Sequence, residues 1–171
     1  VNSTNIMVEG LDLKNNYQGI VIAYSNNVTI CQNNITDNYD GIWLVAPSNN
    51  TIYHNNFINN TNQVGFWPES LKNVWDDGYP SGGNFWSDYF GVDVKSGSNQ
   101  DLPGSDGIGD TPYIIDADNV DHYPLMNPYG APPPPTYTLT ITTTIGGTTN
   151  PAQGTYSYTT NQTVQVTAIP Y

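Results

Sequence analysis

The residues in this chain that are best suited to chemistry are aspartates, and most of them lie in one stretch. Ten of the fifteen acidic residues fall between positions 76 and 121, and Lys95 is the only cation among them. Two carboxylates about 4 Å apart repel each other by roughly 4 kcal/mol at an effective dielectric constant of about 20. A compact fold of this stretch therefore requires separated charges, protonation or a bound cation.

Part of the acidic stretch has the composition of a calcium-binding loop. Residues 106–110 (DGIGD) reproduce the second half of such a loop, in which oxygen ligands alternate with glycines that permit sharp turns. Leu102 and Gly104 stand where a complete loop has carboxylates. The alternative is a turn whose aspartates accept hydrogen bonds from local backbone N–H groups. We expect a structural Ca²⁺ with these ligands: the side chains of Asp93, Asp101, Asp106 and Asp110 and the main-chain oxygen of Ile108.

The net charge of the chain restricts its partners. It is -12, with three lysines and no arginine, so the surface repels nucleic acid and anionic lipid. No apolar run approaches the roughly 18 residues of a membrane span, which argues against direct membrane insertion. Six N-x-[ST] triplets suit a glycosylated extracellular protein, although a sequence rich in Asn and Thr also produces them by chance. The acceptor candidates are Asn2, Asn27, Asn34, Asn49, Asn59 and Asn161.

The elements that position these residues are revealed by a repeat of 22 residues in the first part of the chain. Gly19-Ile20 recurs as Gly41-Ile42, and Thr29-Ile30 recurs as Thr51-Ile52. A unit this short cannot bury its own core, so it must stack on its neighbours with each strand paired to the strand one coil away. We therefore predict an all-β protein: a short right-handed parallel β-helix over residues 1–70, with an irregular closing segment at 71–130.

Two columns of residues in the predicted coils bear on function. Asparagines such as Asn16, Asn38 and Asn60 recur at the bends, where their amides can bond the backbone and each other from coil to coil. A second column points outward and is apolar: Val21, Trp43 and Trp67, the last aligned by assuming a two-residue insertion before Gly65. This column indicates a contact surface for glycans or partner chains. The alternative is that the closing segment covers it.

The pattern N-x-I-x-x-N-x-I-x-x-N-x-x-G-I resembles the parallel β-helix repeats of NosD-like proteins and of carbohydrate-binding and sugar-hydrolase families, which occur in archaeal and bacterial surface proteins. Residues 73–93 (NVWDDGYPSGGNFWSDYFGVD), 105–116 (SDGIGDTPYIID) and 121–128 (DHYPLMNP) resemble the C-terminal closure of NosD-like proteins. The resemblance implies an association with copper. The residues themselves do not, because His54, His122 and Cys31 lack the spacing of a transition-metal site.

Catalytic groups are sparse in the predicted coils. Glycoside hydrolysis needs two carboxylates about 5–10 Å apart across a groove. Asp37 and Asp40 flank one bend, but no acidic column continues into the adjacent coils. Lyases of this fold use Arg or Lys as the base, and the chain contains no arginine. We therefore expect no enzymatic activity.

A second module follows the β-helix. Residues 131–136 (APPPPT) form a semi-rigid polyproline linker. Residues 137–171 alternate tightly between turn signals and predict about three antiparallel strands. The string YTLTITTTIGGTTNPAQGTYSYTTNQTVQVTAIP resembles part of an internalin-type B repeat.

These observations together predict an extracellular or cell-surface protein with a structural or adhesive role. Its expected partners are copies of itself or other surface proteins, with assembly through open strand edges. The alternative is a β-helix that binds or degrades carbohydrate.

Overall fold

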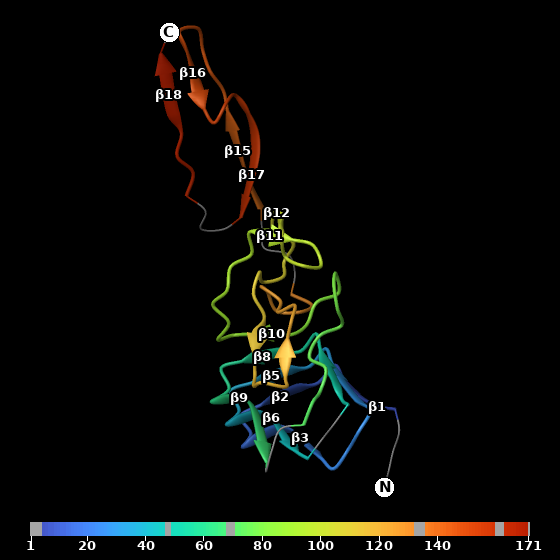
Figure 1. The fold of residues 1–171 in the computed structure, drawn as a ribbon. Coiled ribbons are helices and arrows are strands. Elements are labelled where there is room, and N and C mark those ends of the chain that lie inside the picture. The colour runs from blue at the N-terminus through green and yellow to red at the C-terminus, as the bar shows by residue number, and fades with distance from the viewer. Residues whose placement is uncertain (1–4, 47–48, 68–70, 132–135, 160–162, 171) are drawn as a thin grey trace. The chain divides into compact units, whose positions relative to one another are not determined.

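The computed structural model describes residues 5–46, 49–67, 71–131, 136–159 and 163–170. It divides into two compact units, residues 1–131 and 132–171 (Figure 1). Asn2, Asn161 and most of the polyproline linker lie outside the described residues. Within the described residues every regular element is a β-strand, as the sequence predicted.

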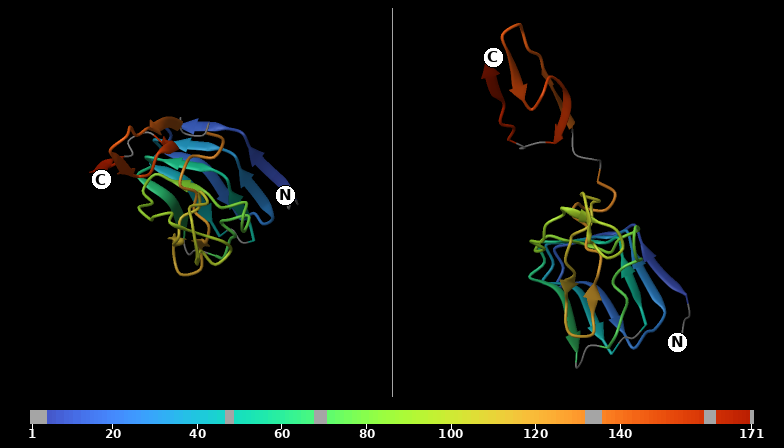
Figure 2. Two further views of the ribbon diagram at one scale, coloured as in Figure 1. Left: turned by 90° about the horizontal axis from the view of Figure 1, so that it is seen from above. Right: turned by 45° about the horizontal axis from the view of Figure 1, so that its top comes forward.

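Unit 1 begins as a parallel β-helix of three sheets, and both views of Figure 2 show strands of successive coils lying alongside one another. Sheet A contains β1 (Ile6–Glu9), β4 (Val28–Cys31) and β7 (Thr51–Tyr53). Sheet B contains β2 (Asp12–Lys14), β5 (Asn34–Thr36), β8 (Asn56–Ile58) and β10 (Phe85–Trp86). Sheet C contains β3 (Gln18–Ala23), β6 (Asp40–Val45) and β9 (Asn62–Trp67).

The strand register follows the 22-residue repeat through all three coils. Ile20 pairs with Ile42 and Ile42 with Val64, so the inward positions of successive coils stack into apolar columns. Ile42 and Leu44 are fully buried. The predicted two-residue insertion is wrong, because the same offset continues without interruption into β9.

At the bends, two adjacent residues have different structural roles. One residue has a positive φ, as in Gln32 (58°) and His54 (56°), and turns the chain. The asparagine that follows it carries a hydrogen-bond ladder: the backbone N–H and the Nδ2 of Asn33 both donate to Oδ1 of Asn55, at 3.1 and 2.9 Å. The predicted amide columns are therefore present, and they use buried side chains rather than exposed ones.

The closing segment, residues 71–130, extends two of the three sheets by one further rung. Val74 forms a parallel bridge with Thr51 of sheet A, and β10 pairs with β8 of sheet B. The remaining strands of the segment are two-residue pieces in antiparallel pairs: β11 (Lys95–Ser96) with β12 (Leu102–Pro103), and β13 (Tyr113–Ile114) with β14 (Val120–Asp121).

The closing segment also covers the end of the apolar core. Trp86 is 1% exposed and stacks on Phe57 of the last coil, with ring centroids 4.3 Å apart and planes 8° apart. Tyr113 also stacks on Trp86, with the same separation and angle. These three rings close the core by continuing its column of side chains into the irregular segment.

The described part of unit 2 contains four strands in two antiparallel pairs, where the sequence predicted about three. β15 (Thr136–Ile141) pairs with β17 (Gly154–Thr159), and β16 (Gly147–Asn150) pairs with β18 (Thr167–Pro170). Most described side chains of this unit are partly or fully exposed, and Ile141 is its buried hydrophobic residue.

Candidate functional site

The outer face of sheet C is apolar over two adjacent columns. The register pairs Val21 with Trp43 as expected, but Trp43 pairs with Gly65, and Trp67 pairs with Val45. Trp67 therefore belongs to the neighbouring column, because the glycine used to align the third coil is not the equivalent of Gly41. We define the outer face of sheet C as the residues of these two columns: Val21, Ala23, Trp43, Val45, Gly65 and Trp67.

This face is open to solvent within the part of the chain that the structure describes. Val21 is 52% exposed and Trp67 is 58% exposed, so the closing segment does not cover them. Trp43 is half-buried because its indole lies over Gly65, where an added Cβ would come within 2.5 Å of the ring. A side chain at position 65 would displace this indole.

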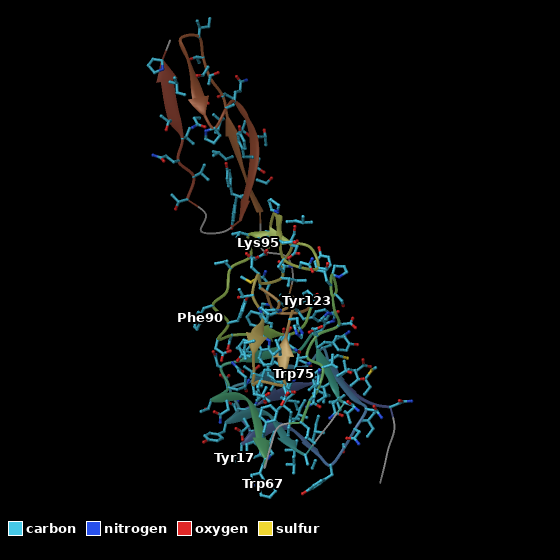
Figure 3. The ribbon with its side chains drawn as sticks, viewed as in Figure 1. Tyr17, Trp67, Trp75, Phe90, Lys95 and Tyr123 are labelled. Atoms are coloured by element: carbon cyan, nitrogen blue, oxygen red, sulfur yellow. The ribbon has the colours of Figure 1, made fainter. Side chains whose placement is uncertain are left out.

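Two tyrosines in neighbouring coils add to the aromatic surface and were missed by the sequence-based search. Tyr17 and Tyr39, at the bends that lead into β3 and β6, stack with ring centroids 4.9 Å apart and planes 5° apart. Both are exposed, and Figure 3 labels Tyr17 and Trp67 on the coils. Their spacing of 22 residues is the signal that could have identified them.

The acidic loop is arranged around its own backbone. Asp93 accepts hydrogen bonds from Ser105 Oγ at 2.6 Å and from the N–H groups of Asp106 and Gly107. Asp110 accepts from the N–H groups of Val94 and Lys95, each at 3.1 Å to Oδ1. The aspartates thus stabilise a chain segment that has few ladder hydrogen bonds of its own.

The carboxylates predicted to bind calcium are not gathered into one cluster among the described residues, and calcium binding stays a prediction. The described residues contain no group of three or more His, Cys, Asp or Glu side chains placed to hold a metal ion. Asp106 accepts from Gly97 N, Gln100 Nε2 and Ile108 N, and Asp101 is exposed. The structure matches the alternative interpretation, in which these carboxylates accept hydrogen bonds from nearby N–H groups.

Asp121 differs from the loop aspartates because it is fully buried. Its Oδ2 accepts hydrogen bonds from Asn84 N at 2.7 Å and Trp86 Nε1 at 2.9 Å, and its Oδ1 accepts from Tyr123 N. Burial raises the pKa of this carboxyl to about 7, and the hydrogen bonds oppose that rise. Gly83 is required beside it, because an added Cβ would lie 1.9 Å from Oδ1.

Asp121 ends one of the asparagine ladders. The ladder runs from Asn33 to Asn55 and Asn84, and the last rung donates to the carboxylate. A second ladder ends on Asn119, which also accepts from Trp75 Nε1 at 2.9 Å. Since every rung donates toward the closing segment, the final group must be an acceptor, and a carboxylate accepts without donating.

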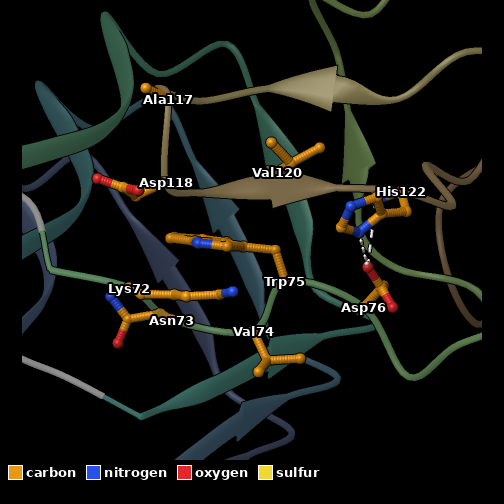
Figure 4. Close-up of a pocket in the computed structure, with 9 residues that line it drawn as sticks. All are labelled: Lys72, Asn73, Val74, Trp75, Asp76, Ala117, Asp118, Val120 and His122. Carbon is orange, nitrogen blue, oxygen red and sulfur yellow. Dashed lines mark hydrogen bonds and ion pairs between the residues drawn. The ribbon is translucent and has the colours of Figure 1, made fainter.

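A cavity of about 360 Å³ lies over Trp75 between residues 72–76 and 117–122 (Figure 4). At one side of it His122 Nδ1 and Asp76 Oδ2 are 2.9 Å apart, and the His122 N–H donates to the same oxygen at 3.1 Å. Asp76 Oδ1 accepts from Gly78 N. This histidine-carboxylate pair joins the two segments that line the cavity.

Two nucleophilic residues, Ser81 and Cys31, are held in structural contacts. Ser81 Oγ donates to Asp77 Oδ2 at 2.7 Å, and His54 Nε2 lies 2.8 Å from Ser81 O and 3.3 Å from Ser81 Oγ. Cys31 is 2% exposed, and desolvation followed by the charge of Glu9 raises the pKa of its thiol. The thiolate is therefore disfavoured at neutral pH.

Four of the six glycosylation candidates lie among the described residues. Asn27, Asn49 and Asn59 are exposed at bends, each with a φ between 53° and 56°. Asn34 is exposed as well, but its Oδ1 accepts a hydrogen bond from Asn56 Nδ2 at 2.7 Å. Glycosylation of any of them stays a prediction.

A family described as "Periplasmic copper-binding protein (NosD)" matches residues 1–91, which is more than half of the chain. The chain therefore belongs to the NosD family, as its repeat pattern indicated. No curated protein and no solved structure matches it. The archaeal type and the internalin-type B repeat stay predictions.

The copper in the family description does not fit the residues of this chain. Its soft or imidazole ligands are one cysteine, two methionines and two histidines. Cys31 is buried, His54 stacks on Tyr129 with centroids 4.1 Å apart, and His122 pairs with Asp76. Within the described ranges these groups do not converge on a common point that could hold a metal.

Proposed function

We propose that this chain is a non-enzymatic structural and adhesive module that acts outside the cytoplasm, at the cell surface, and attaches through the outer face of sheet C. The observation that carries the proposal is that six neighbouring outward positions on three strands are apolar or glycine, and that Trp67 and Val21 are more than half exposed. Contiguous exposed apolar surface of this kind usually marks a contact.

The outward faces of the other two sheets differ. The outward columns of sheet A mix polar with apolar residues: Met7, Glu9, Thr29, Cys31, Thr51 and Tyr53. Those of sheet B do the same: Asp12, Lys14, Asn34, Thr36, Asn56 and Ile58. Sheet C differs because both of its outward columns contain only apolar residues and glycine.

The size of the face determines how it would adhere. Three strands about 4.8 Å apart and about five residues long cover roughly 10 by 17 Å. A stable protein interface buries about 800 Å² on each partner, several times this area. A single contact would be weak, and adhesion would come from many copies presented together.

The family description, which names a periplasmic protein, supports a location outside the cytoplasm. Within the described residues no helix has the length and apolarity of a membrane span. We propose the cell surface as the specific location, with copies of the chain or other surface proteins as partners.

Clustering of beads that each carry many copies of the chain tests the adhesive role. We expect wild-type beads to cluster and Trp67→Ser beads to stay dispersed. Phe90→Ser is the matched control, because Phe90 is a 91% exposed aromatic residue on the closing segment. Equal clustering of the wild type and Trp67→Ser would contradict the proposal, as would equal loss of clustering in both variants.

Carbohydrate binding is a second candidate function, favoured by the exposed parallel stack of Tyr17 and Tyr39. Flat aromatic rings offer an apolar surface with a polar edge, which suits the C–H faces and hydroxyls of a sugar. Binding on a glycan array that disappears in Trp67→Ser and persists in Phe90→Ser would favour this function. Release of reducing sugar by the wild type would contradict the non-enzymatic role.

A further inference from the structure

Sheet C ends differently from the other two sheets. The closing segment continues sheet A through Val74 and sheet B through β10, but among the described residues no strand pairs with the second edge of β9. The edge of β9 is therefore the place where a further rung is missing.

The backbone of β9 shows which groups this edge presents. Ala46 N–H donates to Trp67 C=O, so Trp67 faces β6, and residues of a parallel strand alternate between its two sides. Val64 and Phe66 accordingly direct their N–H and C=O groups away from β6. Within the described chain no backbone hydrogen bond reaches these groups from the open side.

The side chains of the same two residues are also less covered than those of the preceding coil. Ile42 and Leu44 are 0% exposed, whereas Val64 and Phe66, which pair with them, are only partly buried. A strand added at this edge would bury apolar surface and satisfy backbone groups together.

A groove of about 230 Å³ runs beside this edge, between residues 61–64 and residues 113–115. Asp88 also lines this groove and contacts Gln63, the second residue of β9. Its Oδ1 accepts from Gln63 Nε2 at 3.0 Å, and Tyr113 Oη donates to the same carboxylate at 3.2 Å. The exposed carboxylate has capacity for a further donor, and the chain carries a net charge of -12.

We propose that β9 and this groove bind an extended peptide strand that lies parallel to β9, with apolar residues facing the core and a cationic residue near Asp88. The mode is strand addition, in which main-chain hydrogen bonds provide affinity and alternate side chains provide specificity. A whole coil from a second copy does not fit, because Val74 and β10 already occupy the corresponding rung of sheets A and B. The site is an edge, distinct from the outer face of sheet C.

The test uses the full chain and a labelled peptide, acetyl-KGIVIA-amide, which is the β3 sequence with lysine in place of its first residue. In the register of a further coil, the valine amide of the peptide faces Val64 C=O, and the following isoleucine amide faces away. N-methylation of the valine amide should weaken binding in fluorescence anisotropy about tenfold or more, whereas N-methylation of the isoleucine amide should change it less than about twofold.

A protein variant tests the charge at the same site. Asp88→Asn should weaken binding of the lysine peptide about threefold and should leave a glutamate version, acetyl-EGIVIA-amide, unchanged or tighter. A thermal melt of the variant checks that it folds, and the methylated peptides test the edge on unaltered protein. The proposal is overturned if the unmethylated probe does not bind at millimolar concentration, or if the two methylations have equal effects.

Discussion

The closing segment and the outer face of sheet C differ in composition and in what their side chains do. The closing segment contains most of the carboxylates, both buried tryptophans and a histidine-carboxylate pair, and these groups bond to its own backbone or to the ends of the asparagine ladders. The outer face of sheet C has no ionisable group and is exposed. The carboxylates and the histidine of the closing segment therefore stabilise the fold. The candidate binding residues are the apolar side chains on the outer face of sheet C.

The largest effect of a substitution on stability is expected at Asp121. Asp121→Ala leaves the N–H groups of Asn84, Trp86 and Tyr123 buried without their acceptor, each at a cost of about 1–3 kcal/mol. The free energy of unfolding should fall by about 5 kcal/mol in urea denaturation at pH 7. A decrease in the free energy of unfolding of less than about 1 kcal/mol would show that the asparagine ladder does not depend on Asp121 as its final acceptor.

The ionisation of Asp121 should make stability depend on pH. The pKa of its carboxyl is about 7 in the folded chain and 3.8 in the reference state, so the folded state binds the proton more tightly. Its contribution is fully present below about pH 4 and is lost as the pH rises through 7, by up to about 4 kcal/mol. Asp121→Asn should remove this part of the pH dependence. Parallel curves for the two proteins between pH 4 and 8 would contradict the assignment.

The coils could be predicted from the sequence because their inward apolar residues and bend residues recur at a constant spacing. A 22-residue offset that repeats Gly-Ile and Thr-Ile pairs determines which strands stack and places Ile42 and Leu44 in the core. The sequence alignment was wrong in the third coil, where Gln63 stands at the position of the expected glycine. Aligning Gly65 with Gly41 instead assigned Trp67 to the wrong column. One residue that departs from the repeat is enough to shift the register assigned to a whole coil.

The closing segment could not be predicted in the same way, because its contacts span long and unrelated separations. Asn84 and Asp121 are 37 residues apart and belong to no repeat. The calcium site stays a prediction, because the sequence could supply only its composition. Composition shows how many carboxylates are present, but only the folded backbone shows that N–H groups reach Asp93 and Asp110.

A smaller effect is expected in the acidic loop. Asp93→Ala removes one acceptor from two backbone N–H groups and a serine hydroxyl at an exposed site, so we expect a loss of about 1–2 kcal/mol. The melting temperature of the wild type should be the same in calcium and in chelator. A rise of several degrees in calcium that disappears in Asp93→Ala would restore the calcium site.

The smallest effect on stability, and the most direct test of the division between the two regions, is expected at Trp67. Bead clustering and the melting temperature are measured together on Trp67→Ser. We predict that clustering is lost while the free energy of unfolding changes by less than about 0.5 kcal/mol, because the indole is mostly exposed. Clustering that persists, or a loss of clustering explained by unfolding of the variant, would contradict it.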